Sequence, residues 1–350
     1  MTHKDAKGRN YMDIALDLGT SRSRIHTAAN KRIMDEPTVI AYYTESDETA
    51  AVGAQAERML GKTPPSITAV CPLAGGVISH SGLVEEMINI FLKRVCTNKV
   101  VMPRVVACIP GEITDVEKRA MVNAISSFGV RRVYLIESAK AAAMGAGLNI
   151  KLPHGNMIVD LGAGTVDIAV ISLGGVSVSK SIKRAGDAMD EDIVRYVRKK
   201  YSLIIGKQTA CKCKIAIGTL VPPEYNEEFT VKGRDALTGL PASAVVTSQD
   251  IYEAIREVSQ DIVSGILQVL ESTPPELIGD IHTDGITLTG GLSAMTGLAE
   301  LIHEKTGIDN IAVADDAENC VVRGCAMAIT DIADVESGGP SEINPLLAAY

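Results

Sequence analysis

Two short glycine-containing motifs hold the residue types best suited to phosphate and metal chemistry. The first reads Asp-Leu-Gly-Thr at residues 17–20, and the second reads Asp-Leu-Gly-Ala-Gly-Thr at residues 160–165. Glycine-rich turns present backbone N–H groups to an anion, and the missing Cβ lets a ligand come close. Each turn follows an aspartate at a predicted strand end. The pair therefore predicts two loops that hold phosphates from both sides, with Asp17 and Asp160 serving Mg²⁺ through its waters.

Two further positions suit the same chemistry, although each alone has an ordinary explanation. Gly290 and Gly291 follow a predicted buried strand and suit close approach to an adenine or an α-phosphate, while a simple turn is the alternative. Glu137 ends a strand and could orient a water for attack on a γ-phosphate, while a surface carboxylate is the alternative. The Gly-Lys-Thr at residues 61–63 is rejected as a P-loop, because Ala56 stands where glycine is required and two prolines follow.

The elements that must position these residues recur along the chain. Each Asp-Leu-Gly motif lies between two apolar runs that predict a hairpin, at residues 12–27 and 156–171. The repeat indicates a duplicated fold. Further strands are predicted at residues 39–43, 50–52, 104–109, 132–136, 229–236, 243–247 and 286–289. Helices are predicted at residues 83–95, 114–127 (opened by a Thr114/Glu117 capping box), 139–144 (capped by Ser138), 190–201, 251–269, 294–304 and 320–329.

Length and composition narrow the class of protein. A chain of 350 residues exceeds what one core usually supports, so two domains are expected. The formal net charge of -9 argues against a nucleic-acid partner. The 7 cysteines are scattered without a C-x-x-C pair, which indicates reduced cytosolic thiols. Neither a signal peptide nor a membrane-spanning apolar run is visible, so a cytoplasmic location is expected.

Motifs along nearly the whole chain resemble those of the MreB family of bacterial actins, within the actin and heat-shock-chaperone ATPase superfamily. Besides the two Asp-Leu-Gly motifs, they include Asp-Glu-Pro-Thr at 35–38, Met-Leu-Gly-Lys-Thr-Pro at 59–64, Ala-Gly-Asp at 185–187, Thr-Gly-Leu-Pro at 238–241, Thr-Pro-Pro-Glu-Leu at 273–277, Leu-Thr-Gly-Gly at 288–291 and Ala-Asp-Asp at 314–316.

The resemblance implies an α/β, actin-like fold. Two duplicated α/β domains, each with a smaller subdomain, would enclose a nucleotide cleft. Carried over, subdomain IA would comprise residues 12–36, 71–150 and 324–337, and IB residues 37–70. Subdomain IIA would comprise residues 151–187 and 251–323, and IIB residues 188–250. Residues 1–11 and 338–350 are expected to be flexible termini.

The resemblance also implies a function. The chain would bind ATP and Mg²⁺ and polymerise into paired protofilaments on the inner membrane surface. Such filaments guide the cell-wall synthesis machinery and so determine cell shape; a paralogous MreB is a further possible partner. Glu137 and Thr165 would place the attacking water. The implied nucleotide contacts are Asp17, Gly19, Thr20, Ser21, Arg22, Arg24, Asp160, Gly162, Ala163, Gly164, Thr165, Gly186, Asp187, Lys214, Gly290, Gly291 and Leu292.

Several of these positions depart from the family pattern. Residues 21–24 read Ser-Arg-Ser-Arg in place of the usual Ala-Asn-Thr, and Arg24 has two interpretations, a phosphate contact or a surface-directed strand residue. Ala163 and Leu292 stand at family glycines. Two carboxylates of the helix expected to contact ribose and adenine are replaced by Cys211 and Ala216. Because lost ribose acceptors cost roughly 1 kcal/mol each, nucleotide binding is expected to be weaker or differently selective.

A membrane contact is expected at residues 100–102. Val100, Val101 and Met102 follow the first long helix, where the family has a hydrophobic loop, and basic residues flank them. Apolar tips with basic flanks suit anionic lipid. The alternative is that these three residues begin the next strand.

The resemblance leaves the activity open. A slow ATPase whose turnover is coupled to polymerisation is one hypothesis. A divergent paralogue that acts as a filament scaffold or adaptor, with weak or no hydrolysis, is the other. A sugar kinase and a chaperone ATPase rank lower, because no substrate-directed aspartate cluster and no substrate-binding β-domain are apparent in the sequence.

Overall fold

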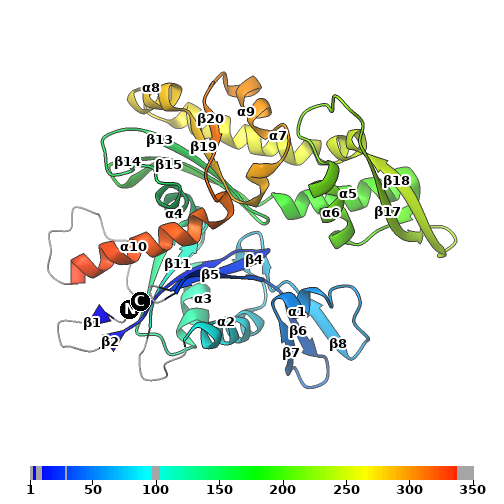
Figure 1. Ribbon diagram of the computed structural model, residues 1–350, viewed down its shortest axis with the longest axis horizontal. Coiled ribbons are helices and arrows are strands. Elements are labelled where there is room, and N and C mark those ends of the chain that lie inside the picture. Colours follow the sequence, from blue (N-terminus) through cyan, green and yellow to red (C-terminus); the bar gives the residue numbers. More distant parts are fainter. Residues whose placement is uncertain (1–2, 5–9, 28–29, 97–102, 337–350) are drawn as a thin grey trace.

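Two five-stranded sheets form the centres of two halves of the molecule (Figure 1). The computed structural model describes residues 3–4, 10–27, 30–96 and 103–336. The first sheet has the order β12 (Arg132–Glu137), β11 (Arg104–Ile109), β3 (Asp13–Leu18), β4 (Arg22–Thr27) and β5 (Asn30–Pro37). The second has the order β20 (Ile311–Val313), β19 (Ile286–Thr289), β13 (Asn156–Leu161), β14 (Val166–Ser172) and β15 (Gly175–Ile182).

The two sheets have the same topology. In each, the strand that carries the Asp-Leu-Gly motif pairs antiparallel with the next strand along the chain and parallel with a strand that comes much later. The turns also match, because the Gly19 N–H donates to the Arg22 carbonyl at 3.1 Å and the Gly162 N–H donates to the Thr165 carbonyl at 2.9 Å. The duplicated fold predicted from the repeated motif is confirmed.

Helices cover both sheets and fill the space between them (Figure 1). Their buried residues recur at helical spacing, as at Val84, Met87, Ile88 and Phe91 of the helix at 81–95, and the predicted Thr114/Glu117 capping box is present at the start of α3. In the first half they are α2 (Ser81–Val95), α3 (Asp115–Ser126), α4 (Ser138–Gly145) and α10 (Cys320–Glu336); in the second they are α7 (Ser248–Ser272), α8 (Pro275–Asp284) and α9 (Leu298–Thr306).

Helices α4 and α10 pack unusually closely, and two glycines allow it. A Cβ added at Gly145 would lie 1.8 Å from the Cys320 carbonyl oxygen. A Cβ added at Gly324 would lie 1.8 Å from the Ala141 carbonyl oxygen. The two backbones therefore touch directly at both places, on the sides of the sheets that face each other.

A smaller group of elements extends from each half. From the first half extend α1 (Ala54–Glu57) and a three-stranded sheet of β7 (Thr49–Val52), β6 (Ile40–Tyr43) and β8 (Ile67–Val70). From the second extend α5 (Gly186–Tyr201), α6 (Lys207–Ile217) and a sheet of β16 (Leu203–Ile204), β17 (Glu228–Asp235) and β18 (Pro241–Thr247). Two short pairs, β1 (His3–Lys4) with β2 (Asn10–Tyr11) and β9 (Leu73–Ala74) with β10 (Val77–Ile78), and two 3₁₀ turns, η1 (Gly291–Ala294) and η2 (Ala317–Asn319), complete the described elements.

Two local predictions are wrong. The helix predicted at residues 294–304 is split into η1 and α9, because Gly297 takes a left-handed conformation with φ of 80° between them. Ser138 does not cap α4, since Glu137 is the N-cap and the Ser138 hydroxyl donates to the Ile109 carbonyl at 3.1 Å. Helix α5 begins at Gly186, four residues before the predicted start, and α10 runs beyond residue 329.

Some expectations fall outside the described residues. These are the membrane contact at Val100, Val101 and Met102, and most of the two termini predicted to be flexible. Among the helices that the structure describes, none has the length and apolar character needed to span a bilayer.

Candidate functional site

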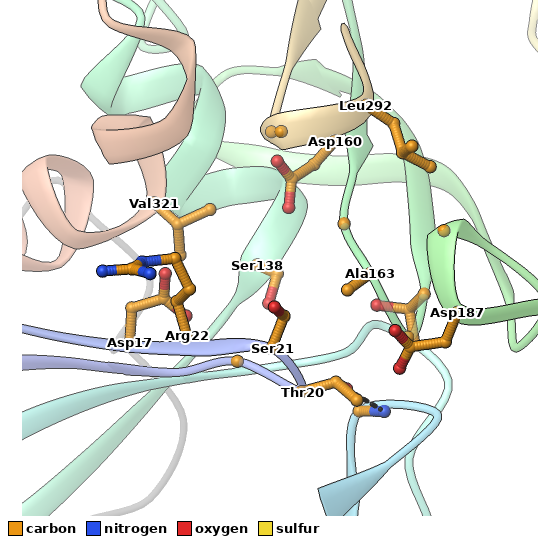
Figure 2. Close-up of a pocket in the computed structure, with 18 of the residues that line it drawn as sticks. Asp17, Thr20, Ser21, Arg22, Ser138, Asp160, Ala163, Asp187, Leu292 and Val321 are labelled. Atoms are coloured by element: carbon orange, nitrogen blue, oxygen red, sulfur yellow. Dashed lines mark hydrogen bonds between the residues drawn. The ribbon is translucent and has the colours of Figure 1, made fainter. Parts of the chain in front are cut away.

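A cavity of about 330 Å³ lies between the two five-stranded sheets, where their hairpin turns face each other (Figure 2). Every residue that the sequence predicted to contact nucleotide lines it: Asp17, Gly19, Thr20, Ser21, Arg22, Arg24, Asp160, Gly162, Ala163, Gly164, Thr165, Gly186, Asp187, Lys214, Gly290, Gly291 and Leu292. The fold therefore gathers these residues around one space, and their roles toward a ligand remain predictions.

The two glycine-containing turns come very close on one side of the cavity. A Cβ added at Gly164 would lie 2.1 Å from Thr20 Oγ1 and 2.9 Å from the Gly76 nitrogen. The Thr20 hydroxyl in turn accepts a hydrogen bond of 3.0 Å from the Gly76 N–H (Figure 2). Glycine at position 164 is therefore required for the approach of the two turns, and the backbone N–H groups of both can face one anion.

Asp17 and Asp160 approach the cavity from opposite sheets (Figure 2). Asp160 Oδ1 accepts a hydrogen bond of 2.9 Å from Thr289 Oγ1, and Asp17 Oδ1 accepts one of 3.1 Å from the Cys108 thiol. Burial, with the neighbouring Asp167 carboxylate, raises the pKa of Asp160 to about 7. Burial also raises the pKa of Asp17. Two desolvated carboxylates of raised pKa favour a nearby cation, because a cation offsets the cost of their ionisation.

Asp167 is a third buried carboxylate of the cavity, and the sequence analysis missed it. It accepts hydrogen bonds from Thr165 Oγ1 at 3.0 Å and from the Gly111 N–H at 3.2 Å. Burial raises its pKa. It fixes the hydroxyl of Thr165 and links the second Asp-Leu-Gly turn to the loop after β11. The available signal was an aspartate inside an otherwise apolar strand.

Glu137 does not line the cavity, although its neighbour Ser138 does. It stands at the end of β12 and is half-buried. Burial raises the pKa of Glu137, and the nearby Lys140 and Lys118 act in the opposite direction. The predicted water-orienting carboxylate therefore stands at the N-cap of α4, next to a lining residue but outside the lining itself.

Lys214 of helix α6 also lines the cavity. The Lys214 ammonium is buried, lies 2.7 Å from Asp190 Oδ1 and donates to the Gly186 carbonyl at 2.8 Å. Asp190 was not predicted as a site residue, although it also lines the cavity. Of the two positions where the family carboxylates are replaced, Cys211 lines the cavity and Ala216 does not.

The residues at positions 22 and 24 extend from β4 into the same cavity. Arg22 Nε donates to Asp35 Oδ1 at 2.7 Å and is partly exposed. Arg24 is 12% exposed, and its guanidinium lies among the carboxylates of Asp17, Asp35 and Glu318. The interpretation of Arg24 as a surface-directed residue is therefore wrong.

Comparisons of the sequence with known proteins give matches over most of the chain. The sequence profile of the family described as MreB/Mbl protein matches residues 11–337. The chain is 40% identical to the cell shape-determining protein Mbl of Bacillus subtilis over 321 residues, which cover 91% of this chain and 96% of that protein. It is 39% identical to the cell shape-determining protein MreB of Escherichia coli over 341 residues, which cover 96% and 98% of the two chains.

Solved structures show the same fold. The crystal structure of MreB5 of Spiroplasma citri bound to ADP superposes with a TM-score of 0.88 at 34% identity, covering 94% of this chain and 99% of that one. A double helical filament of MamK has a TM-score of 0.80 at 21% identity and covers 92% and 99% of the two chains. The predicted actin-like fold is confirmed.

Proposed function

Since the chain belongs to the MreB/Mbl family of actin-like proteins, we propose that it binds ATP in the cavity between its two sheets and polymerises into membrane-associated filaments that organise cell-wall synthesis. The observation that carries the proposal is the pair of facing Asp-Leu-Gly turns, one from each half, that line one cavity. A nucleotide held by both turns joins the two halves. Related MreB5 structures bound to ADP and to AMPPNP, at 34% identity, support the ligand class.

The residues around the cavity fit a nucleotide with its magnesium. The close approach at Gly164 brings the two glycine-containing turns together at the cavity, and one buried donor, Arg24 Nε, has no hydrogen-bond partner among the described residues. Asp17 and Asp160 would hold Mg²⁺ through its waters, and the described residues include no cluster of three or more ligating side chains that could hold a bare ion. Bound Mg²⁺ neutralises charge on the phosphates and polarises them.

For hydrolysis, this chain offers Thr165 and Glu137. The Thr165 hydroxyl donates to Asp167, so one of its lone pairs is left to accept a hydrogen bond from a water in the cavity. Glu137, which precedes the lining residue Ser138, would orient that water and accept its proton. The raised pKa of this carboxyl favours that role. Because Glu137 does not line the cavity, the alternative of a scaffold or adaptor with weak or no hydrolysis is retained.

The distribution of exposed apolar residues supports self-association. Leu237 and Leu240 are 87% and 65% exposed at the tip of the β17–β18 hairpin, at one end of the long axis (Figure 1). Leu173 is 68% exposed in the β14–β15 turn at the opposite end. Exposed apolar residues at opposite ends favour head-to-tail contacts between subunits. Such contacts generate an open filament when the rotation from one subunit to the next does not close into a ring.

The test is sedimentation with negative-stain microscopy in ATP, in ADP and without nucleotide, while phosphate release is followed. ATP-dependent filaments with phosphate release are expected. Filaments that ignore nucleotide would favour the scaffold alternative. No filaments in any condition, including with lipid vesicles, would contradict self-assembly.

Replacing Glu137 by alanine is expected to lower phosphate release about 100-fold, the usual contribution of a general base, while filaments still form in ATP. Glu86→Ala, which removes an exposed carboxylate of α2, is the matched control and should release phosphate at the wild-type rate. Equal rates in the Glu137 variant and the wild type would show that the role assigned to Glu137 is wrong.

Replacing Gly164 by alanine should weaken ATP binding about 5- to 140-fold, since overpacking costs typically about 1–3 kcal/mol and the new Cβ would separate the two turns. Isothermal titration calorimetry measures the change. Gly206→Ala, at a glycine with no atom within 4 Å of the added Cβ, is the control. Unchanged affinity in the Gly164 variant would mean that the nucleotide does not need the two turns in contact.

A further inference from the structure

Arg24 occupies the middle of a row of charges that crosses three neighbouring strands. In the register of the first sheet it pairs with Asp17 of β3 on one side and with Asp35 of β5 on the other. Its Nη1 lies 3.9 Å from Asp17 Oδ2, and its Nε lies 3.6 Å from Asp35 Oδ1. Cross-strand pairs share one face of a sheet, and here that face borders the cavity.

One donor of this guanidinium has no hydrogen-bond partner among the described residues. Arg24 Nη2 donates to Glu318 Oε2 at 3.1 Å, and the Glu318 side chain is 60% exposed. Arg24 Nε is buried and makes no hydrogen bond with any described residue. A buried donor without an acceptor is costly, and a guanidinium has five N–H donors in a fixed planar arrangement. An anion bound beside this guanidinium would supply an acceptor.

The other cationic side chains that line the cavity in the described part of the chain are already engaged. Lys214 is buried against Asp190 and the Gly186 carbonyl. Arg22 donates to Asp35 and is more exposed than Arg24. Arg24 also pairs with carboxylates, but among these three side chains it alone combines burial, a buried donor without a hydrogen bond and a position beside Asp17, the carboxylate assigned to the metal.

We propose that Arg24 provides a fixed positive charge at the phosphate end of the cavity, so that nucleoside di- and triphosphates bind this chain with only weak dependence on Mg²⁺. This inference rests on the proposed nucleotide binding. A divalent cation reduces the repulsion between phosphates and the Asp17 and Asp160 carboxylates. A guanidinium offsets the same repulsion, binds phosphate oxygens in a bidentate manner and cannot be removed by a chelator.

The experiment measures the dissociation constant of ATP by calorimetry, once with MgCl₂ and once with EDTA. In the wild type, removal of Mg²⁺ is expected to raise the dissociation constant less than about tenfold, which is below 1.4 kcal/mol. In Arg24→Gln, the same removal should raise it more than about 100-fold, because neither cation then offsets the repulsion between the phosphates and the Asp17 and Asp160 carboxylates. Arg24→Lys, which retains the charge, should remain close to the wild type in this ratio.

Two controls separate a phosphate contact from a structural role. Arg195→Gln removes one charge from an exposed arginine of α5 outside the cavity and should leave the ratio unchanged. AMP, with one phosphate, should lose less affinity than ATP in Arg24→Gln. If Arg24 serves only to hold Asp17 and Asp35, the variant will melt at a lower temperature while the ratio stays at the wild-type value, and the proposal fails.

The outcomes also distinguish this proposal from the proposed function. ATP binding that requires Mg²⁺ equally in the wild type and in Arg24→Gln would overturn the role of Arg24 and leave nucleotide binding intact. No binding of ATP or ADP in either buffer would overturn both.

Discussion

Replacing Gly324 by alanine will lower the free energy of unfolding by about 3 kcal/mol, the upper part of the range for overpacking a core. The added Cβ would lie 1.8 Å from the Ala141 carbonyl oxygen and 2.8 Å from the Ala141 Cα. Both atoms belong to backbone, so no side-chain rotation can relieve the contact. Helices α4 and α10 would have to move apart, and the apolar contacts between them would be lost.

Urea unfolding followed by circular dichroism measures this loss. Gly279→Ala is the matched control, because Gly279 lies inside α8 and an added Cβ there meets no atom within 4 Å. That control should gain up to about 1 kcal/mol from helix propensity. Gly145→Ala should behave like Gly324→Ala, since its Cβ would meet the Cys320 backbone. A loss below about 1 kcal/mol at Gly324 would show that the two helices separate at little cost.

Replacing Asp160 by asparagine will stabilise the nucleotide-free protein above pH 7. Burial raises the pKa of Asp160 from 3.8 to about 7, so the folded state keeps a proton that the unfolded state loses between these values. Stability therefore falls as pH rises from about 4 to 7, and it stays low above pH 7. At about 1.4 kcal/mol for each pKa unit, the effect is at most about 4 kcal/mol.

The measurement is urea unfolding of the wild type and Asp160→Asn at several pH values between 4 and 8, without nucleotide. The difference between the two free energies should grow toward higher pH, because asparagine carries no proton to lose. Asp17 and Asp167 titrate in both proteins, and because their charges help to raise the pKa of Asp160, the difference measures Asp160 together with its coupling to these two carboxylates. Asp309→Asn, at an exposed position, is the control. A difference that does not vary with pH would contradict the ionisation assigned to Asp160.

Much of the fold could be predicted because it depends on a repeated local pattern. The Asp-Leu-Gly motif between two apolar runs specifies a hairpin, and its recurrence indicated two equivalent halves. The failures concern choices that tertiary contacts decide. Ser138 is a favourable cap by residue type, yet its hydroxyl reaches the Ile109 carbonyl of the neighbouring strand instead. Gly297 interrupts an apolar helical pattern because its left-handed conformation redirects the chain into α9.

The residues that line the cavity were predicted where a distinctive local motif contains them, and two buried carboxylates outside such motifs were missed. The glycine turns and their aspartates were found because their local sequence is distinctive. Asp167 was missed. The alternation of side chains along β14 shows which face of the sheet Asp167 lies on, but it does not show whether that face borders a cavity or a helix. Asp190 was missed as a site residue for a similar reason: its partner Lys214 is far away in sequence, and no local pattern links them. The sequence left two interpretations of Arg24. The structure decides against a surface position because Asp35 of β5 and Glu318 of η2 lie around its guanidinium.

The direct backbone contact between α4 and α10 also determines how the two halves can move. The chain passes from one sheet to the other after α4, and it returns between η2 and α10, so both connections lie next to the contact at Gly145 and Gly324. A rotation of one half relative to the other would therefore take place about this contact. The β17–β18 hairpin lies at the end of the molecule that is far from this contact (Figure 1). Such a rotation, if it began with a small shift of the two glycine-containing turns, would move the exposed leucines of that hairpin by a larger distance.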